Sequence, residues 1–293
     1  MHIYINQELF RGAKMGYSLR RIDKAAEEAE IIDAEMYPGI VFFSDCHRGC
    51  GTWNDSFLRN KTLYQAALNH YRKSGYAYVE LGDGDELWEN RCFESIAEIH
   101  KDVFEILSQF ERERRLFMIY GNHDKTRKKQ SRCTSENLFS PKYNQSAVIE
   151  LPDKKGSLYL MHGHQGDMLN DRLWPLARWM VRYLWRPLEL CGFNDPTSAA
   201  RNYKKSSAVE KRLIDWAKKN GSSIMTGHTH RPAMRKVDDI YYFNTGSCVH
   251  PNGITCIELS GKLFMLVKWT ICADDNGFMY VCRQVMTAMD MQA

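Results

Sequence analysis

Residues 116–124 read LFMIYGNHD, a short apolar run that ends in glycine and then in three polar residues. Such a run predicts a buried strand followed by a tight turn. Two similar segments precede it, IVFFSDCH at 40–47 and YAYVELGDGD at 76–85, and two follow it, SLYLMHGH at 157–164 and SIMTGHTH at 223–230. Each of these strands is therefore expected to end in Asp, Asn or His side chains.

Longer helical patterns separate the apolar runs, at roughly 57–73, 93–114 and 206–220. A sixth run lies at 241–244, and the last 40 residues have the pattern of strands. This alternation predicts an α/β layered domain rather than a helical bundle or an all-β sandwich. Ligands of α/β sheets gather beyond the carboxyl ends of the strands, so we expect the five polar ends to meet at one crevice.

The length of 293 residues and the 44% hydrophobic content allow one large domain with a full core. We expect a basic, helix-prone extension over residues 1–38, which ends at Pro38 and Gly39, and a main domain over 39–293. The formal charge of +4 is too small to indicate tight binding of nucleic acid.

The nine cysteines form no CxxC pair, which predicts neither a disulfide framework nor a thiolate zinc site. The N-terminus lacks the features of an export signal, and no stretch approaches the roughly 20 apolar residues of a membrane-spanning helix. Together these features predict a cytoplasmic protein.

The residue types at the strand ends suit a pair of divalent metal ions, because Asp, Asn and His offer oxygen and imidazole nitrogen donors. A carboxylate has two oxygens and can bridge two cations. Manganese is the expected metal, although iron, zinc and magnesium accept the same donors. A single DxH or HxH is usually only a turn at a strand end, but five such motifs in order favour a metal site.

Read together, DCH, GDGD, GNHD, HGH and GHTH resemble the ordered signature of the calcineurin-like metallophosphoesterases, over residues 40 to about 250. The resemblance implies a four-layer α/β/β/α sandwich, here with a helical insertion at about 168–205. It also implies hydrolysis of a phosphate ester or pyrophosphate by a hydroxide that bridges two divalent ions.

The resemblance also implies roles for individual residues. Seven are expected to be metal ligands: Asp45, His47 and His230 for one ion, Asn122, His162 and His228 for the other, and Asp83 as the bridge. His123 is expected to donate to the leaving-group oxygen, and Asp124 to orient His123. His164 and Asp85 are second choices for the positions given to His162 and Asp83.

Within this superfamily, GDGDELWEN, GHTHRP and the insertion resemble the UDP-2,3-diacylglucosamine pyrophosphatases, which implies a nucleotide- or lipid-linked diphosphate as substrate. This chain departs from them at His123, where they have arginine, and in HGHQGD at residues 162–167. Histidine at this position is common in enzymes that cut monoesters and diesters. A phosphomonoesterase or protein phosphatase, a nucleic-acid phosphodiesterase and a non-catalytic metal-binding module therefore remain alternatives.

The insertion carries Arg178, Arg182 and Arg186 at intervals of four, which predicts one basic stripe on a helix surrounded by Trp, Met and Leu. This pattern is typical of a lid over an acyl chain or of a helix on the inner surface of a membrane, and equally of a helix packed on the core. We assign Arg178 and Arg182 to substrate binding, together with a run of donors that is more often merely solvated: Arg201, Asn202, Lys204 and Lys205.

Overall fold

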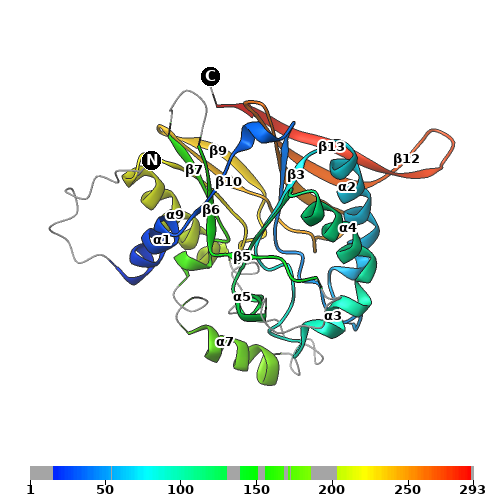
Figure 1. Ribbon diagram of the computed structural model, residues 1–293, viewed down its shortest axis with the longest axis horizontal. Coiled ribbons are helices and arrows are strands. Elements are labelled where there is room, and N and C mark those ends of the chain that lie inside the picture. The colour runs from blue at the N-terminus through cyan, green and yellow to red at the C-terminus, as the bar shows by residue number, and fades with distance from the viewer. Residues whose placement is uncertain are drawn as a thin grey trace.

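The computed structural model describes residues 16–53, 55–130, 139–150, 156–167, 171, 173–185 and 203–291. In this part of the chain two β-sheets pack against each other between two layers of helices (Figure 1). The expected four-layer α/β/β/α sandwich is confirmed.

The first sheet has the strand order β13-β12-β11-β2-β3-β4-β5. Its strands are β2 (Ile40–Phe43), β3 (Ala77–Leu81), β4 (Leu116–Ile119), β5 (Tyr143–Asn144), β11 (Ile254–Ser260), β12 (Leu263–Ala273) and β13 (Met279–Asp290). Strands β2 to β5 are parallel, and β11 joins β2 in antiparallel orientation. The helices on its outer side are α2 (Lys61–Lys73), α3 (Phe93–Ile99) and α4 (Lys101–Arg112), preceded by the short η3 (Leu58–Asn60).

The second sheet has the strand order β1-β6-β7-β8-β10-β9. Its strands are β1 (Glu30–Ile32), β6 (Ser146–Glu150), β7 (Ser157–Met161), β8 (Ser223–Thr226), β9 (Ala233–Val237) and β10 (Ile240–Asn244). Helices α1 (Tyr17–Glu27) and α9 (Tyr203–Lys219) cover its outer side. Short elements complete the described fold: η2 (Ala34–Met36), α5 (Arg127–Gln130), η5 (His164–Gly166), α7 (Trp174–Met180) and the π-helical turn η6 (Val181–Trp185).

The layered core explains why the central strands are apolar at successive positions rather than at alternate ones. In β2, Ile40 and Phe42 pack between the two sheets, whereas Val41 and Phe43 pack against the helices α2 to α4. All four side chains are fully buried. A strand with both faces covered needs a continuous apolar run, and such a run is what the sequence shows at 40–43.

The predicted strands that carry the polar ends are all present, and the C-terminal strands are confirmed. The pattern at 93–114 forms two helices, α3 and α4, which are separated at His100. The helical interpretation of the N-terminal segment is correct for α1 and wrong for Glu30–Ile32, which forms β1. This strand exists because it pairs with β6, more than 100 residues away, and no local pattern reveals that partner. The boundary at residue 38 stays a prediction.

One disulfide joins Cys272 in β12 to Cys282 in β13, so the expectation of no disulfide is wrong for this pair. The hairpin pairs Thr270 with Cys282 and Cys272 with Tyr280, which brings the two Cα atoms to 6.0 Å. That separation lies within the normal range for a disulfide. The cause is the register of the hairpin, which the spacing of the cysteines does not reveal.

Candidate metal centre

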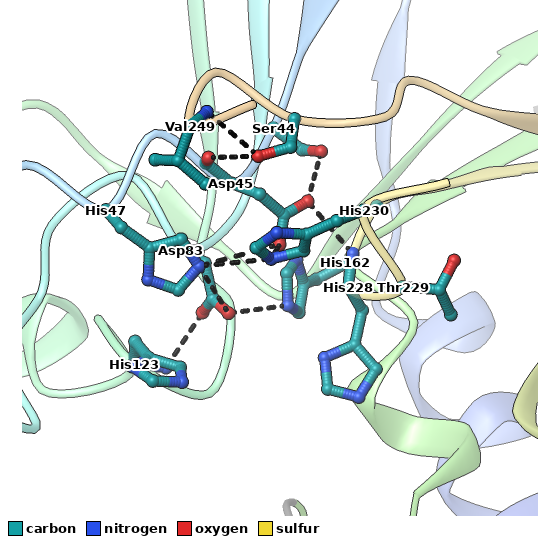
Figure 2. A network of polar contacts seen from close by, with 12 residues as sticks. Ser44, Asp45, His47, Asp83, His123, His162, His228, Thr229, His230 and Val249 are labelled. Carbon is teal, nitrogen blue, oxygen red and sulfur yellow. Dashed lines mark hydrogen bonds and ion pairs between the residues drawn. The ribbon is translucent and has the colours of Figure 1, made fainter. Parts of the chain in front are cut away.

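The polar side chains that follow five strands gather at one place, at the ends of these strands (Figure 2). Strands β2, β3 and β4 deliver their loops from the first sheet, and β7 and β8 deliver theirs from the second. The expected convergence is therefore correct, with the ends contributed by two sheets that face each other.

One group of donors consists of Asp45, His47 and His230. Asp45 Oδ1 lies 3.0 Å from His230 Nε2 and 3.9 Å from His47 Nε2, and the two imidazole nitrogens are 3.3 Å apart. Three donor atoms that face one another at such distances match the environment of a cation.

A second group consists of Asp83, His162 and His228. Asp83 Oδ2 lies 3.0 Å from His162 Nε2 and 3.9 Å from His47 Nε2, so this carboxylate lies between the two groups. This is the position that a bridging ligand requires. The alternatives lie elsewhere, because Asp85 accepts from Arg48 at 2.8 Å and His164 belongs to neither group.

Several buried polar atoms at the centre make no hydrogen bond of normal geometry among the described residues. They are Asp45 Oδ1, Asn122 Oδ1, His162 Nε2 and His228 Nε2. Asp45 Oδ1 and His162 Nε2 each face an oppositely charged or chargeable group at 3.0 Å, His230 and Asp83 respectively. Buried polar atoms normally have a hydrogen-bond partner, and a bound ion is one explanation for atoms that lack one. The oxygen and imidazole donors fit divalent metal ions.

The other polar atom of several of these side chains is held by the protein, which leaves the donor atom directed at the centre. Asp45 Oδ2 accepts from the hydroxyl of Ser44 and from the backbone N–H of His228, and Oδ1 faces the histidines. Asp83 Oδ1 accepts from the backbone N–H of His123 at 2.8 Å. His162 Nδ1 donates to the carbonyl of Leu81 at 2.7 Å, so Nε2 remains the available donor.

The backbone around the centre is strained. Five of the expected ligands have left-handed conformations although none is glycine: Asp45 (φ 53°), His47 (48°), Asp83 (53°), His228 (66°) and His230 (56°). Each such residue costs on the order of 1–3 kcal/mol, a strain that proteins commonly retain at functional sites. Gly82 and Gly121 lie against each other, and a Cβ added at Gly82 would lie 2.6 Å from the backbone nitrogen of Gly121.

Electrostatics keep the carboxylates of the centre ionised. Burial by itself would lower the pKa of His162, but the nearby Asp83 carboxylate outweighs it and raises this pKa to about 9. The pKa of Asp83 is lowered despite its burial, because His162, His123 and His47 surround it. The acidic groups therefore favour positive charge at this position, and a bound cation would supply such charge.

Glu86 is a residue of the site that the sequence interpretation missed. Its buried carboxylate accepts from His47 Nδ1 at 2.7 Å and from His123 Nδ1 at 2.8 Å. One side chain thus orients both an expected metal ligand and the expected leaving-group donor. The only signal for it was the acidic run GDGDE, in which Glu86 follows Asp83 by three positions.

The predicted contact between Asp124 and His123 does not form. Asp124 instead accepts from the backbone N–H groups of Gly121 at 2.6 Å and of Gly84 at 2.8 Å, which holds two loops together. Burial, with the nearby charges of Asp83, Asp85 and Glu80, raises the pKa of Asp124 to about 7. Asp124 does not reach the imidazole because its carboxylate is held by the backbone of its own loop and of the preceding loop, and Glu86 occupies the position beside the ring.

Of the expected substrate-binding residues that the structure describes, Lys205 is linked to the centre through Asp167, whereas Arg178 and Arg182 make other contacts. Arg182 donates to the carbonyls of Trp88 at 2.8 Å and of Leu87 and Asn90 at 3.1 Å, so it attaches the insertion to the segment after β3. Arg178 stacks over Trp174, Lys204 is exposed, and Lys205 pairs with Asp167 at 2.9 Å. Asp167 in turn lies 3.6 Å from His228 Nε2. Arg186, Arg201 and Asn202 lie outside the described residues.

The fold and the centre agree with the comparison to known families. The model of the calcineurin-like phosphoesterase family matches residues 39–232, and the chain belongs to this family. Membership implies a phosphoester hydrolase that uses divalent metal ions.

Solved structures with a similar chain path include a predicted phosphoesterase from Streptococcus pneumoniae, at 16% identity and TM-score 0.37, covering 85% of this chain and 97% of that one. Another is the phosphoesterase Yfce from E. coli, at 17% identity and TM-score 0.40, covering 85% of this chain and 100% of that one. Vacuolar Protein Sorting 29 from Cryptosporidium parvum is similar at 12% identity and TM-score 0.42, covering 86% and 98%. No curated protein sequence matches the chain.

Proposed function

We propose that the protein hydrolyses a phosphate ester or phosphoanhydride bond at a centre that holds two divalent metal ions. The observation that carries this proposal is the convergence of buried donor atoms from Asp45, Asn122, His162 and His228 that make no hydrogen bond of normal geometry among the described residues. Asp45, His47 and His230 would hold one ion, and Asn122, His162 and His228 the other, with Asp83 between them. When bound, such ions lower the pKa of a water molecule and offset the charge of the phosphate.

The protein contributes orientation and proton transfer. Glu86 accepts from His123 Nδ1, which leaves His123 Nε2 to face the substrate and to donate to the departing oxygen. The indole of Trp88 stacks on the His123 ring with centroids 4.1 Å apart, and this contact restricts the tilt of the imidazole. Both contacts fix the orientation of the His123 imidazole before the substrate binds.

Removal of metal is the first test. We expect a chelator to abolish hydrolysis of bis(p-nitrophenyl) phosphate and manganese to restore it, because no other group in the described site supplies comparable positive charge. Metal content should approach two ions per chain when activity is restored. Full activity in a metal-free preparation would contradict the proposal.

For the substrate we rank a nucleotide- or lipid-linked diphosphate first, by resemblance to the UDP-2,3-diacylglucosamine pyrophosphatases. Phosphomonoesters and phosphoproteins come next, and nucleic acid last. A panel of UDP-linked sugar lipids, nucleotides, phosphopeptides and oligonucleotides separates these classes through their kcat/KM values. A preference for a monoester would overturn the ranking.

We further propose that the insertion contacts a lipid surface. Leu176 is 50% exposed and Trp179 is 56% exposed, and both lie on α7 close to Arg178. An exposed apolar surface beside a cation suits the interface of an anionic membrane. Among the residues that the structure describes, no helix has the length and apolarity needed to cross a bilayer.

Co-sedimentation with anionic vesicles tests this contact. We expect Trp179→Ser to reduce the bound fraction severalfold, because the variant lacks the indole that would enter the apolar part of the interface. Tyr280→Ser is a matched control, since Tyr280 is 53% exposed and belongs to the distant strand β13. Equal losses from both variants, or no binding by the unaltered protein, would remove the proposed contact.

A further inference from the structure

Two carboxylates and two guanidinium groups are buried together beside the loops that carry the metal ligands. Arg48 donates through Nη1 and Nη2 to the two oxygens of Glu80, at 2.9 and 2.8 Å, and through Nε to Asp85 Oδ1 at 2.8 Å. These three side chains are fully buried. Arg127 Nε lies 3.3 Å from Asp85 Oδ2, so the charges of the four residues balance. We call Arg48, Glu80, Asp85 and Arg127 the buried ion cluster.

The buried ion cluster connects the loop after β2 to the loop after β3. Arg48 directly follows the expected ligand His47, and Asp85 is two residues after the bridging Asp83. The backbone joins the same loops, because the N–H of His47 donates to the carbonyl of Asp83 and the N–H of Arg48 to that of Gly84, both at 2.9 Å. The cluster therefore lies where two loops that carry metal ligands meet.

Gly84 shows how closely the loop after β3 packs against the cluster. A Cβ added at Gly84 would clash with Glu80 Oε1 and with Arg48 Nη2. Glycine is required at this position because the backbone passes directly over the ion pair. A displacement of the pair would therefore move the segment that carries Asp83.

The ligands beside the cluster have backbone conformations that need support. His47 and Asp83 are both left-handed, with φ of 48° and 53°. Such conformations persist only where the surrounding structure holds them. All three nitrogen atoms of the planar Arg48 guanidinium are used, two on Glu80 and one on Asp85. A lysine has a single nitrogen and could not reproduce this arrangement.

Stability alone gives little reason for these charges. Replacement of a buried ion pair by apolar side chains of similar volume is often neutral or stabilising. The surroundings suit apolar side chains, since the Arg48 guanidinium lies over the ring of Phe104, 5.2 Å from its centroid. Apolar side chains would not reproduce the directional contacts between the two loops.

We infer that Arg48 is a positioning residue of the metal centre: its guanidinium fixes the loop of Asp83 relative to that of His47 and so sets the affinity for metal ions. The inference rests on the proposed function, because it requires a metal centre at these loops. It gives a role to a side chain that bonds to Glu80 and Asp85 rather than to a metal ligand.

Arg48→Lys tests the inference, because it keeps the charge and removes the planar group. We expect the dissociation constant for Mn²⁺, measured by calorimetry without substrate, to rise about 10–100-fold. The visible absorption of bound Co²⁺ depends on the coordination geometry, so the spectrum of the Co²⁺-loaded variant should also change.

Arg283→Lys is the matched control. Arg283 likewise contacts a buried carboxylate, Glu258, through Nε at 2.7 Å and Nη2 at 2.5 Å, but the two residues belong to strands β13 and β11 and not to the loops of the centre. We expect this variant to unfold at a lower temperature and to keep the Mn²⁺ dissociation constant and the Co²⁺ spectrum of the unaltered protein.

The double variant Arg48→Met/Glu80→Met separates positioning from stability. Apolar side chains replace the ion pair, and Arg127 stays beside Asp85, so the protein should remain folded. We expect it to bind Mn²⁺ at least about tenfold more weakly. An unchanged Mn²⁺ dissociation constant in either folded variant would overturn the inference. Failure of both variants to fold would assign the cluster to stability and overturn it as well.

Failure of the inference and failure of the proposed function give different results. If the unaltered protein binds metal and hydrolyses phosphate esters, and Arg48→Lys changes neither property, only the inference is overturned. Weaker metal binding by Arg48→Lys in a protein that hydrolyses no phosphate compound would support the positioning role and contradict the proposed function.

Discussion

Asp83→Asn is expected to lower hydrolysis of bis(p-nitrophenyl) phosphate by more than about 100-fold. Changes to groups that merely orient a metal ligand typically cost 10–100-fold, and Asp83 lies directly between the two groups of donors. Asparagine keeps an oxygen that can accept from the N–H of His123 and tolerates the left-handed backbone at this position. The loss should therefore come from the missing charge and appear in kcat together with the metal content per chain.

Two controls accompany this variant. Asp239→Asn makes the same chemical change at an exposed residue before β10 and should retain full activity. Circular dichroism should show that Asp83→Asn keeps a folded far-UV spectrum but unfolds at a lower temperature, because His162 loses its charged partner. Retention of activity and of two metal ions by Asp83→Asn would rule out the assigned centre.

Glu86→Gln is expected to lower kcat by about 10–100-fold. A glutamine side chain has a single acceptor oxygen, so it cannot accept hydrogen bonds from His47 Nδ1 and His123 Nδ1 through separate oxygens as the carboxylate does. One of the two imidazoles then loses its orientation. The measurement is kcat against pH at saturating metal. The alkaline limb should shift to lower pH, because His123 loses the carboxylate that raises its pKa.

A double-mutant cycle separates this role from a general loss of structure. In a His123→Ala background the further effect of Glu86→Gln should be smaller than in the unaltered protein, because the two residues act as a unit. Glu98→Gln, at an exposed position in α3, controls for the change in charge. Fully additive effects would show that Glu86 does not act through His123.

The contrast between Glu86 and Asp124 shows where the sequence interpretation reaches its limit. Asp124 is adjacent to His123 in the chain, and the resemblance assigned it the contact with that imidazole. In the structure Glu86 makes the contact, and Asp124 joins Gly84 to Gly121. Adjacent residues on a tight turn point in different directions, and only the packing of three loops decides which carboxylate reaches the ring.

The insertion shows the same limit. Its arginines recur every four residues, which predicted a basic stripe for substrate binding. Arg182 instead uses its donors on three backbone carbonyls of the segment after β3. Since a carbonyl group is present at every residue, no sequence pattern can reveal which ones a distant guanidinium will find.

The sequence alone determined the buried strands, the glycine turns and the types and order of the donors at the strand ends, because these depend on neighbouring residues and on the period of the backbone. Tertiary structure alone decided that β1 joins the second sheet, that Cys272 meets Cys282, and that Glu86 serves two histidines. These contacts depend on how the two sheets and their loops pack, and packing brings together residues whose partners lie far away along the chain.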